Sequence, residues 1–211
     1  MELFSYFRSS ASYRVRIALA LKGLDYDYRA VHLAKNEQLG EAYASASFSR
    51  LVPLLRDGDD QAISQSLAII EYLDEIHPEP PLLPPDPFDR AQVRALALDI
   101  ACEIHPLNNL RVLRYLVKEM GVDDDSKNRW YRHWVESGLE PVEQRLLLHA
   151  GKFCFGDQPG LADCALVPQI FNAQRFDCRL DHLPEVMRVF DNCMALDAFA
   201  NSQPSACPDA E

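Results

Sequence analysis

The sequence predicts a chain in two parts, an N-terminal α/β part with the element order βαβ–ββα and an all-α C-terminal part. Three observations predict this fold class. Short apolar runs alternate with helical patterns over residues 2–76. Six prolines then fall within residues 78–87, a composition that excludes helix and strand and stiffens a connection. From residue 88 onward the pattern is helical almost throughout.

The proline cluster sets the expected domain boundaries. We expect a first domain over residues 1–80, a proline-rich linker over 81–87 and an all-helical domain over 88–211. A chain of 211 residues, 48% of them hydrophobic, buries a sizeable core without metal or disulfide support.

The α/β part begins with a predicted strand, helix and strand. Residues 2–7 form an apolar and aromatic strand, and residues 11–22 form a helix with one apolar face that ends at Gly23. Residues 25–33 alternate loosely and are predicted as a second strand. Because a helix connects these strands, we expect them to be parallel.

The rest of the α/β part is predicted as a hairpin followed by a helix. Residues 35–50 are a polar, partly helical connection, and residues 51–56 form the third strand. The Asp-Gly pair within residues 57–60 favours a hairpin turn, so residues 62–64 form an antiparallel fourth strand. A helix with a buried apolar stripe follows over residues 67–76.

Four helical stretches are predicted in the C-terminal part. They cover residues 88–120, 126–150, 160–172 and 184–200. Pro106 is expected to kink or break the first of them. The polar tail, residues 202–211, is expected to be frayed.

The charge and cysteine content narrow the class of protein. A formal net charge of −11 argues against nucleic acid and anionic membranes as partners. The six cysteines form no C-x-x-C pair, so we expect neither a metal site nor a disulfide framework. The start of the chain lacks the pattern of a signal peptide, and no apolar run reaches the length of about 18 residues needed for a membrane span. We therefore expect a cytoplasmic protein with reduced cysteines.

Serines crowd the junction between the first strand and the first helix. Ser9, Ser10 and Ser12 lie where backbone N–H groups lack intrahelical partners and the helix dipole is positive. This junction can stabilise a thiolate or another anion. The residues alone leave two interpretations open, because serines in these positions also serve as plain helix N-caps.

Three separated motifs carry a family resemblance. They are Ser9-Ser10-Ala11-Ser12-Tyr13-Arg14-Val15-Arg16-Ile17-Ala18-Leu19, Gln65-Ser66-Leu67-Ala68-Ile69-Ile70-Glu71-Tyr72-Leu73 and Ala162-Asp163-Cys164-Ala165-Leu166-Val167-Pro168-Gln169. In this order they resemble the zeta class of cytosolic glutathione transferases, which includes the maleylacetoacetate and maleylpyruvate isomerases. The segment Ile104-His105-Pro106-Leu107-Asn108-Asn109-Leu110 resembles the bacterial isomerases of that class.

The resemblance implies a fold and a function. It implies a thioredoxin-like N-terminal domain, an all-α C-terminal domain, glutathione as cofactor and a homodimer. The expected reaction is cis–trans isomerisation of maleylpyruvate or maleylacetoacetate, small dicarboxylates of aromatic catabolism, by reversible thiolate addition, bond rotation and elimination. One alternative is a glutathione transferase that conjugates or dehalogenates small electrophiles such as α-haloacids. Another is a non-catalytic glutathione-binding protein.

The sequence departs from the family pattern in three places. Ala11 stands where the zeta motif has a cysteine, so catalysis cannot require that thiol, and it is the feature that keeps the non-catalytic alternative open. The pair Ser47-Phe48 replaces Asn-Pro before the third strand. Gly160 replaces the serine or threonine that caps the helix containing Asp163, at a cost of a few tenths of a kcal/mol.

The resemblance assigns the glutathione site to the first domain. Ser9 is expected to stabilise the thiolate, with Ser10 as the second candidate. Val52-Pro53 resembles the family's cis-proline turn, whose valine backbone pairs with extended glutathione like an added strand. The alternative is a trans proline that begins an edge strand.

Three further residues of the first domain are expected at the cofactor. Gln65 and Ser66, at a helix start, are expected to hold the γ-glutamyl carboxylate, and a plain N-cap is the alternative. Gln38 is expected to reach the glycyl end of glutathione.

The second domain is expected to add both cofactor and substrate contacts. Asn108 and Asn109 match family positions near glutathione and the substrate. His105 precedes them by one helical turn and is also expected at the cofactor. Guanidinium forks suit carboxylates, and the expected ones are Arg8, Arg111 and Arg175. The alternative for His105, Arg111 and Arg8 is a solvated polar surface.

Two further features, a group of aromatic residues and one acidic residue, are interpreted as structural. Trp130, Tyr131 and Trp134 lie at helical spacing and are expected to be core or packing residues and not a ligand-binding group. Asp163 is expected to cap its helix.

Overall fold

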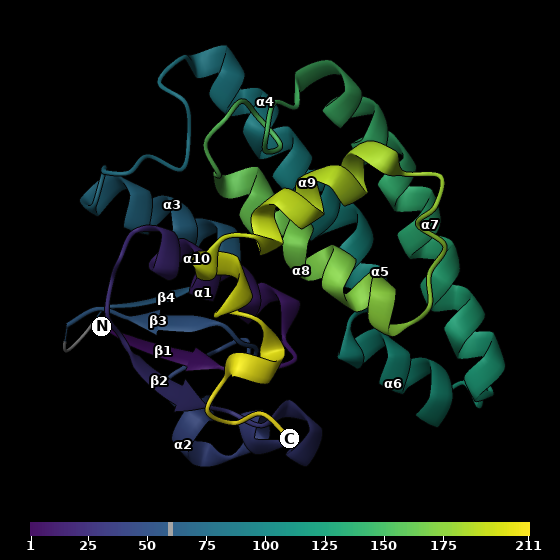
Figure 1. The fold of residues 1–211 in the computed structure, drawn as a ribbon. Helices are drawn as coiled ribbons and strands as arrows, with labels where there is room; N and C mark the ends of the chain where they lie inside the picture. The colour runs from purple at the N-terminus through teal and green to yellow at the C-terminus, as the bar shows by residue number, and fades with distance from the viewer. Residues whose placement is uncertain (59–60) are drawn as a thin grey trace. The chain divides into compact units, whose positions relative to one another are not determined.

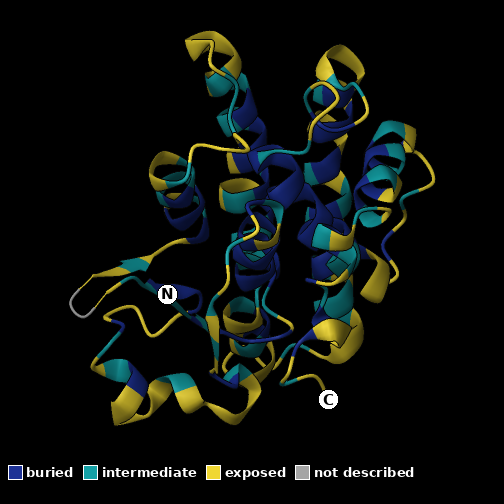
Figure 2. Ribbon diagram, turned by 60° about the vertical axis from the view of Figure 1, so that its left-hand side comes forward, coloured by how far each residue is buried: buried dark blue, intermediate teal, exposed yellow. Residues whose placement is uncertain are grey.

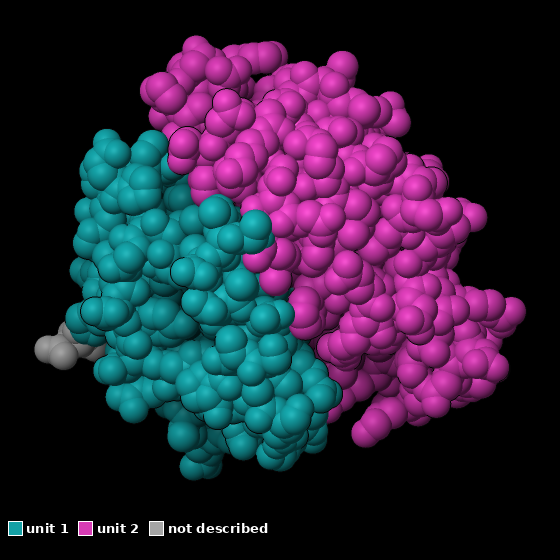
Figure 3. Space-filling model, in the orientation of Figure 1, with its two compact units in different colours: residues 1–82, 195–211 teal, residues 83–194 magenta. Residues whose placement is uncertain are grey.

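The computed structural model describes residues 1–58 and 61–211. The chain divides into two compact units, residues 1–82 with 195–211 and residues 83–194 (Figure 3). Part of the predicted hairpin turn, residues 59–60, lies outside the described residues.

The first unit is built on a mixed four-stranded sheet with the order β2-β1-β3-β4 (Figure 1). The strands are β1 (Glu2–Ser5), β2 (Asp27–Ala30), β3 (Leu54–Arg56) and β4 (Ala62–Ser64). β1 runs parallel to β2 and antiparallel to β3, and β3 runs antiparallel to β4. The predicted βαβ–ββα order is confirmed.

Two helices of the first unit pack against each other, α1 (Ser10–Leu21) and α3 (Ser66–Ile76). Ile17 of α1 and Ile70 of α3 are among the buried apolar residues of these helices. Buried residues are dark blue in Figure 2. The connection between β2 and β3 holds three short helical segments, η1 (Leu33–Lys35), η2 (Glu37–Leu39) and α2 (Glu41–Ala44).

Two arginines of α1, Arg14 and Arg16, are buried, although the sequence pattern places them beside the apolar face. Arg16 donates hydrogen bonds to three neutral oxygens: Ser202 O at 3.0 Å, Ser5 Oγ at 3.2 Å and Phe7 O at 3.2 Å. A guanidinium carries five donors, and hydrogen bonds of this kind make its burial tolerable.

The C-terminal segment, residues 195–211, belongs to the first unit and contains α10 (Asp197–Ala200) and η4 (Pro204–Ala206). The prediction of a frayed tail is wrong. Cys207 is buried and the Asp209 carboxylate accepts hydrogen bonds from the first unit. Two polar groups of the tail instead accept hydrogen bonds: Ser202 O from buried Arg16, and the Asp209 carboxylate, in partly buried hydrogen bonds, from Phe7 N and Tyr28 Oη.

The second unit is helical throughout. Its elements are α4 (Pro87–Leu98), the π-helical segment η3 (Asp99–Ile104), α5 (His105–Asn108), α6 (Leu110–Lys118), α7 (Asp124–His149), α8 (Leu161–Arg175) and α9 (Pro184–Met194). The first predicted helix breaks at Asn109, whose backbone is extended, and not at Pro106. Pro106 lies in α5, which continues η3 without interruption, so the π-helical segment ends two residues before the proline.

Asp163 caps α8, as predicted. Its carboxylate accepts hydrogen bonds from Cys154 N at 2.9 Å and Gly160 N at 2.8 Å. All six cysteines are free thiols, and only Cys102 is exposed. Among the described residues, no helix has the length and apolar character needed to cross a membrane.

Candidate active site

Ser9 lies in the turn between β1 and α1 and is the N-cap of α1. Its Oγ accepts a hydrogen bond from Ser12 N at 3.2 Å, and its own N–H donates to Tyr6 O at 2.9 Å. A serine hydroxyl that accepts through a lone pair still has a proton to donate. Capping and thiolate stabilisation are therefore compatible roles for Ser9.

The first turn of α1 adds backbone donors at the same place. Its first N–H groups have no partner within the helix, and the dipole places partial positive charge there. Ser10 is buried as the first residue of the helix. Ser12 is fully buried, and its hydroxyl has no hydrogen-bond partner among the described residues.

Gln65 has a positive φ of +73°, with ψ of 115°. Such a conformation is costly for a residue other than glycine and is concentrated at functional sites. Gln65 is the N-cap of α3 but makes no side-chain capping bond, and it is exposed. The side chain is therefore available to a ligand.

Ser66 connects the two helix starts of the first unit. It is buried, and its Oγ accepts a hydrogen bond from Arg14 Nη1 of α1 at 3.3 Å. This contact places a guanidinium between the N-terminal turns of α1 and α3. Two positive helix termini and a buried cation favour an anionic ligand at this end of the unit.

The Val52–Pro53 peptide is cis, as the resemblance implied. Both residues are buried immediately before β3. Val52 packs in one cluster with Tyr6 and Phe7, which precede the serine turn. Gln38 lies in η2, and its Oε1 is buried with no hydrogen-bond partner among the described residues.

Strand register brings these segments to one edge of the sheet. Phe4 of β1 pairs with Leu54 of β3, which pairs with Ser64 of β4. The serine turn follows β1, Val52-Pro53 precedes β3 and Gln65-Ser66 follows β4. All three segments therefore leave the sheet at the same edge.

The residues on and beside α5 predicted to lie near glutathione differ from one another in burial and hydrogen bonding. His105 is half-buried at the start of α5, and Asn108 is buried with no hydrogen-bond partner for its Nδ2 among the described residues. Asn109 caps α6: it accepts from Val112 N at 3.1 Å and donates to Pro106 O at 2.9 Å. The structure thus gives Asn109 a structural role.

The arginines predicted for the substrate lie on exposed positions. Arg8 lies in the serine turn over the ring of Phe7, and Arg111 is on α6. Arg175 ends α8, with its guanidinium over the Phe176 ring at 5.0 Å from the centroid. Exposure leaves these guanidinium groups accessible to a carboxylate.

Two adjacent residues of α7, Trp130 and Tyr131, contact α5 and the end of α8. Trp130 Nε1 donates to Leu107 O at 2.7 Å, and Tyr131 stacks on Phe176 with ring centroids 3.8 Å apart. This confirms the predicted packing role of Trp130 and Tyr131. It also places Asn108 and Arg175 on segments anchored to one turn of α7.

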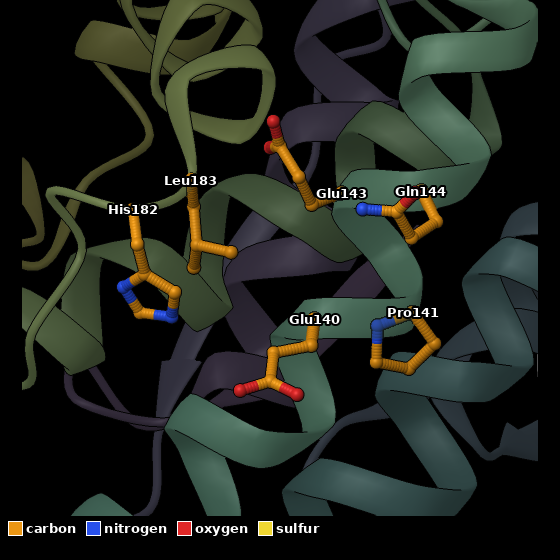
Figure 4. Close-up of a pocket in the computed structure, with 6 residues that line it drawn as sticks. All are labelled: Glu140, Pro141, Glu143, Gln144, His182 and Leu183. Carbon is orange, nitrogen blue, oxygen red and sulfur yellow. The ribbon is translucent and has the colours of Figure 1, made fainter.

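A pocket of about 390 Å³ in the second unit contains none of the predicted site residues (Figure 4). Its lining includes Glu140, Glu143 and His182. Glu143 is buried and its carboxylate accepts from Glu185 N and Val186 N, so it caps α9. Among the described residues, no group of three or more His, Cys, Asp or Glu is arranged to hold a metal ion.

Some contacts at the site have no local signal in the sequence. The hydrogen bond from Arg14 to Ser66 joins residues 52 positions apart, and Asp209 meets Phe7 across 202 positions. A search for polar residues on the buried face of α1 would find Arg14 and Arg16. No local pattern identifies their partners.

Comparisons with known proteins agree with this arrangement. Residues 8–76 match the family model of the glutathione S-transferase N-terminal domain. A probable maleylacetoacetate isomerase of Vibrio cholerae is 49% identical over 99% of this chain and 97% of its own length.

Solved structures agree as well. The holo structure of a maleylpyruvate isomerase, described as a bacterial zeta-class glutathione S-transferase, is 45% identical with a TM-score of 0.97, and the alignment covers 100% of both chains. A maleylacetoacetate isomerase of Anaeromyxobacter dehalogenans, solved with dicarboxyethyl glutathione and citrate in its active site, is 44% identical with a TM-score of 0.89 over 100% of this chain and 97% of its own.

The thioredoxin-like unit with its serine turn and the helical unit define a glutathione transferase. The chain belongs to the zeta-class family of maleylacetoacetate and maleylpyruvate isomerases. The predicted family and fold class are confirmed.

Proposed function

We propose that this protein is a glutathione-dependent isomerase that converts the cis double bond of maleylpyruvate or maleylacetoacetate to the trans form. The observation that carries the proposal is the single sheet edge at which Ser9, Val52-Pro53 and Gln65-Ser66 leave the strands. Glutathione supplies a thiolate that adds to the double bond and leaves after rotation, so it is regenerated.

The residues of the first unit fit glutathione. The Ser9 hydroxyl and the first-turn N–H groups of α1 stabilise the thiolate, with Ser10 as the second candidate. The α3 start at Gln65 and Ser66 binds the γ-glutamyl carboxylate. Gln38 offers a buried acceptor without a partner among the described residues, and we assign it to the glycyl end of the tripeptide. The Val52 backbone pairs with the extended peptide.

The second unit contributes cofactor and substrate contacts in this proposal. Asn108 and His105 lie on α5 and are assigned to glutathione, and the buried Asn108 Nδ2 has no hydrogen-bond partner among the described residues. Arg175 lies at the end of α8. Arg8, Arg111 and Arg175 are the candidate ligands of the substrate carboxylates. Dicarboxyethyl glutathione, seen in a relative, joins a thioether to two carboxylates, and it supports a site that takes the thiol and a dicarboxylate together.

The decisive experiment measures whether glutathione is consumed. A maleyl substrate is incubated with this protein and one hundredth of its concentration of glutathione, and both isomers are quantified by absorbance and chromatography. Complete conversion to the fumaryl isomer supports isomerisation. Turnover that stops at one equivalent of glutathione indicates a conjugating transferase. Binding of glutathione without either reaction indicates a non-catalytic protein.

The same resemblance leads us to propose a cytoplasmic homodimer. Six free thiols suit a reducing compartment. Phe48 is a fully exposed aromatic side chain, and a second copy of the chain would remove it from water. Light scattering should give twice the mass of 23.9 kDa, and Phe48→Ser should shift the equilibrium toward the monomer.

A further inference from the structure

Asp209, near the C-terminal end of the chain, is hydrogen-bonded to the segment that leads into the serine turn. Asp209 Oδ2 accepts a hydrogen bond from the backbone N–H of Phe7 at 3.2 Å, and Asp209 Oδ1 accepts from Tyr28 Oη at 2.6 Å. Phe7 ends the segment from β1 and lies two residues before Ser9. One carboxylate of the tail thus joins the serine turn to β2.

The carbonyl of the same Phe7 residue is held from the other side. Arg16 Nη2 donates to Phe7 O at 3.2 Å, and Arg16 Nε donates to Ser202 O of the tail at 3.0 Å. The backbone groups of Phe7 are therefore fixed by a buried cation and by a carboxylate. Both anchors depend on residues of the C-terminal segment.

Loss of these hydrogen bonds to the Phe7 backbone would be costly because Phe7 is buried. Phe7 is 3% exposed and packs with Cys207 of the tail in one apolar cluster. A buried N–H left without an acceptor loses a hydrogen bond that water cannot replace. Burial and the hydrogen bond to Asp209 raise the pKa of Tyr28, so its hydroxyl remains a donor.

We propose that Asp209 is a positioning residue that fixes the Phe7 peptide and thereby sets where the Ser9 hydroxyl and the first N–H groups of α1 meet the glutathione sulfur. The inference rests on the proposed function for the role of Ser9. Ser9 N donates to Tyr6 O, so a shift at residues 6–7 is passed directly to the serine. Misplacement of catalytic groups by about 1 Å costs up to roughly 10²-fold in rate.

The test compares Asp209→Ala and Tyr28→Phe with the control Asp197→Ala. Asp197 is an exposed acid of the same C-terminal segment, so its variant matches the change in charge. The ionisation of protein-bound glutathione is followed by thiolate absorbance against pH, and kcat/KM for the maleyl substrate is measured over the same range.

We expect Asp209→Ala to raise the pKa of the bound thiol and to lower kcat/KM roughly tenfold at pH 7. The deficit should narrow at high pH, where the thiol ionises without help. Tyr28→Phe should change both quantities in the same direction by less, and the control should match the wild type.

An unchanged thiol titration in folded Asp209→Ala would overturn the inference, as would an activity loss that is the same at every pH. If Asp209→Ala does not fold, Tyr28→Phe decides, because an unaltered titration in that variant also overturns it. The titration requires no maleyl substrate. A wild-type protein that ionises bound glutathione without isomerising anything would therefore refute the proposed function and leave this inference standing.

Discussion

The carboxylate of Asp163 accepts a hydrogen bond from the backbone N–H of Gly160 at 2.8 Å, closing the first turn of α8. The other oxygen of Asp163 accepts from Cys154 N at 2.9 Å, so the same side chain holds the loop that precedes the helix. Asp163 is 1% exposed, and both donors depend on it.

Replacement of Asp163 by alanine should therefore destabilise the protein strongly. Two backbone N–H groups would lose their acceptor, at about 1–3 kcal/mol each. We expect a loss of roughly 2–6 kcal/mol in the free energy of unfolding, measured with urea. Asp157→Ala is the matched control, because Asp157 also accepts from a backbone N–H, that of Lys152, but in an exposed position. Equal losses in the two variants would contradict this account.

Gly160→Ser should stabilise the protein slightly. Gly160 has an extended backbone, with φ of −144°, which any residue adopts, and it offers no side-chain acceptor to the first turn of α8. A serine hydroxyl supplies that acceptor, and we expect a gain of a few tenths of a kcal/mol. Thermal unfolding measures it, and a lower midpoint would show that the cap lacks space for the hydroxyl.

Ser9→Ala should impair the ionisation of bound glutathione. Without the hydroxyl, the pKa of the bound thiol should rise toward its free value of about 8.5, and kcat should fall by roughly 10²-fold at pH 7. The variant also loses an N-cap, worth about 1 kcal/mol, so its stability is measured in parallel. Ser9→Thr keeps a hydroxyl and should retain most of the thiolate. Full activity in Ser9→Ala would transfer the catalytic role to Ser10.

Arg175→Ala should weaken binding of the dicarboxylate. The loss of a charged hydrogen bond of about 1.5–3 kcal/mol predicts a rise of roughly 10- to 100-fold in KM for the maleyl substrate, with KM for glutathione unchanged. Arg179→Ala, an exposed arginine just beyond α8, is the control. An unchanged KM in Arg175→Ala would remove this residue from the substrate site.

Glu2 should make the stability of the sheet depend on pH. The Arg29 guanidinium, 2.6 Å from Glu2 Oε1, and then Arg56 hold the pKa of Glu2 below its ordinary value of about 4.3. Between the two pKa values the unfolded chain binds more protons, so this contribution rises with pH. It is fully present above about pH 4.3 and is lost as the pH falls through the folded pKa.

The measurement is the urea midpoint of the wild type and of Glu2→Gln between pH 3 and 6. The wild type should be the more stable protein at pH 6, and the difference should shrink as the pH falls. A difference that stays constant over the range would show that the carboxylate contributes by packing and not by charge.

Hydrophobic periodicity and the positions of the prolines predict the order of helices and strands, because both are local properties of the sequence. The strands come out shorter than predicted: the second is predicted over residues 25–33 and observed as Asp27–Ala30. Strand ends depend on pairing with a partner, and within the described part of the chain β2 pairs with the four residues of β1 alone. The sequence of a strand alone therefore does not predict where the strand ends.

The long-range polar contacts could not be predicted. Arg16 is charged, yet its buried position becomes reasonable only once Ser202 O is beside it, 186 residues away. The polar composition of residues 202–211 predicts fraying for the same reason. The sequence shows the hydrogen-bond acceptors of this segment but does not show that donors of α1 lie beside them. The π-helical turn η3 also lacks a local signal, since Asp99–Ile104 is as helical in composition as its surroundings.

Phe4, Leu54 and Ser64 mark the end of the strands at which the proposed glutathione site lies, and Glu2, Arg56 and Ala62 mark the opposite end. The hairpin closes there, at the pair Arg56 and Ala62. A fluorophore, an affinity tag or a surface anchor can therefore be attached at Gln61, an exposed residue beside Ala62. A group attached there would lie at the end of the strands opposite to the proposed glutathione site, and the immobilised enzyme should keep its turnover.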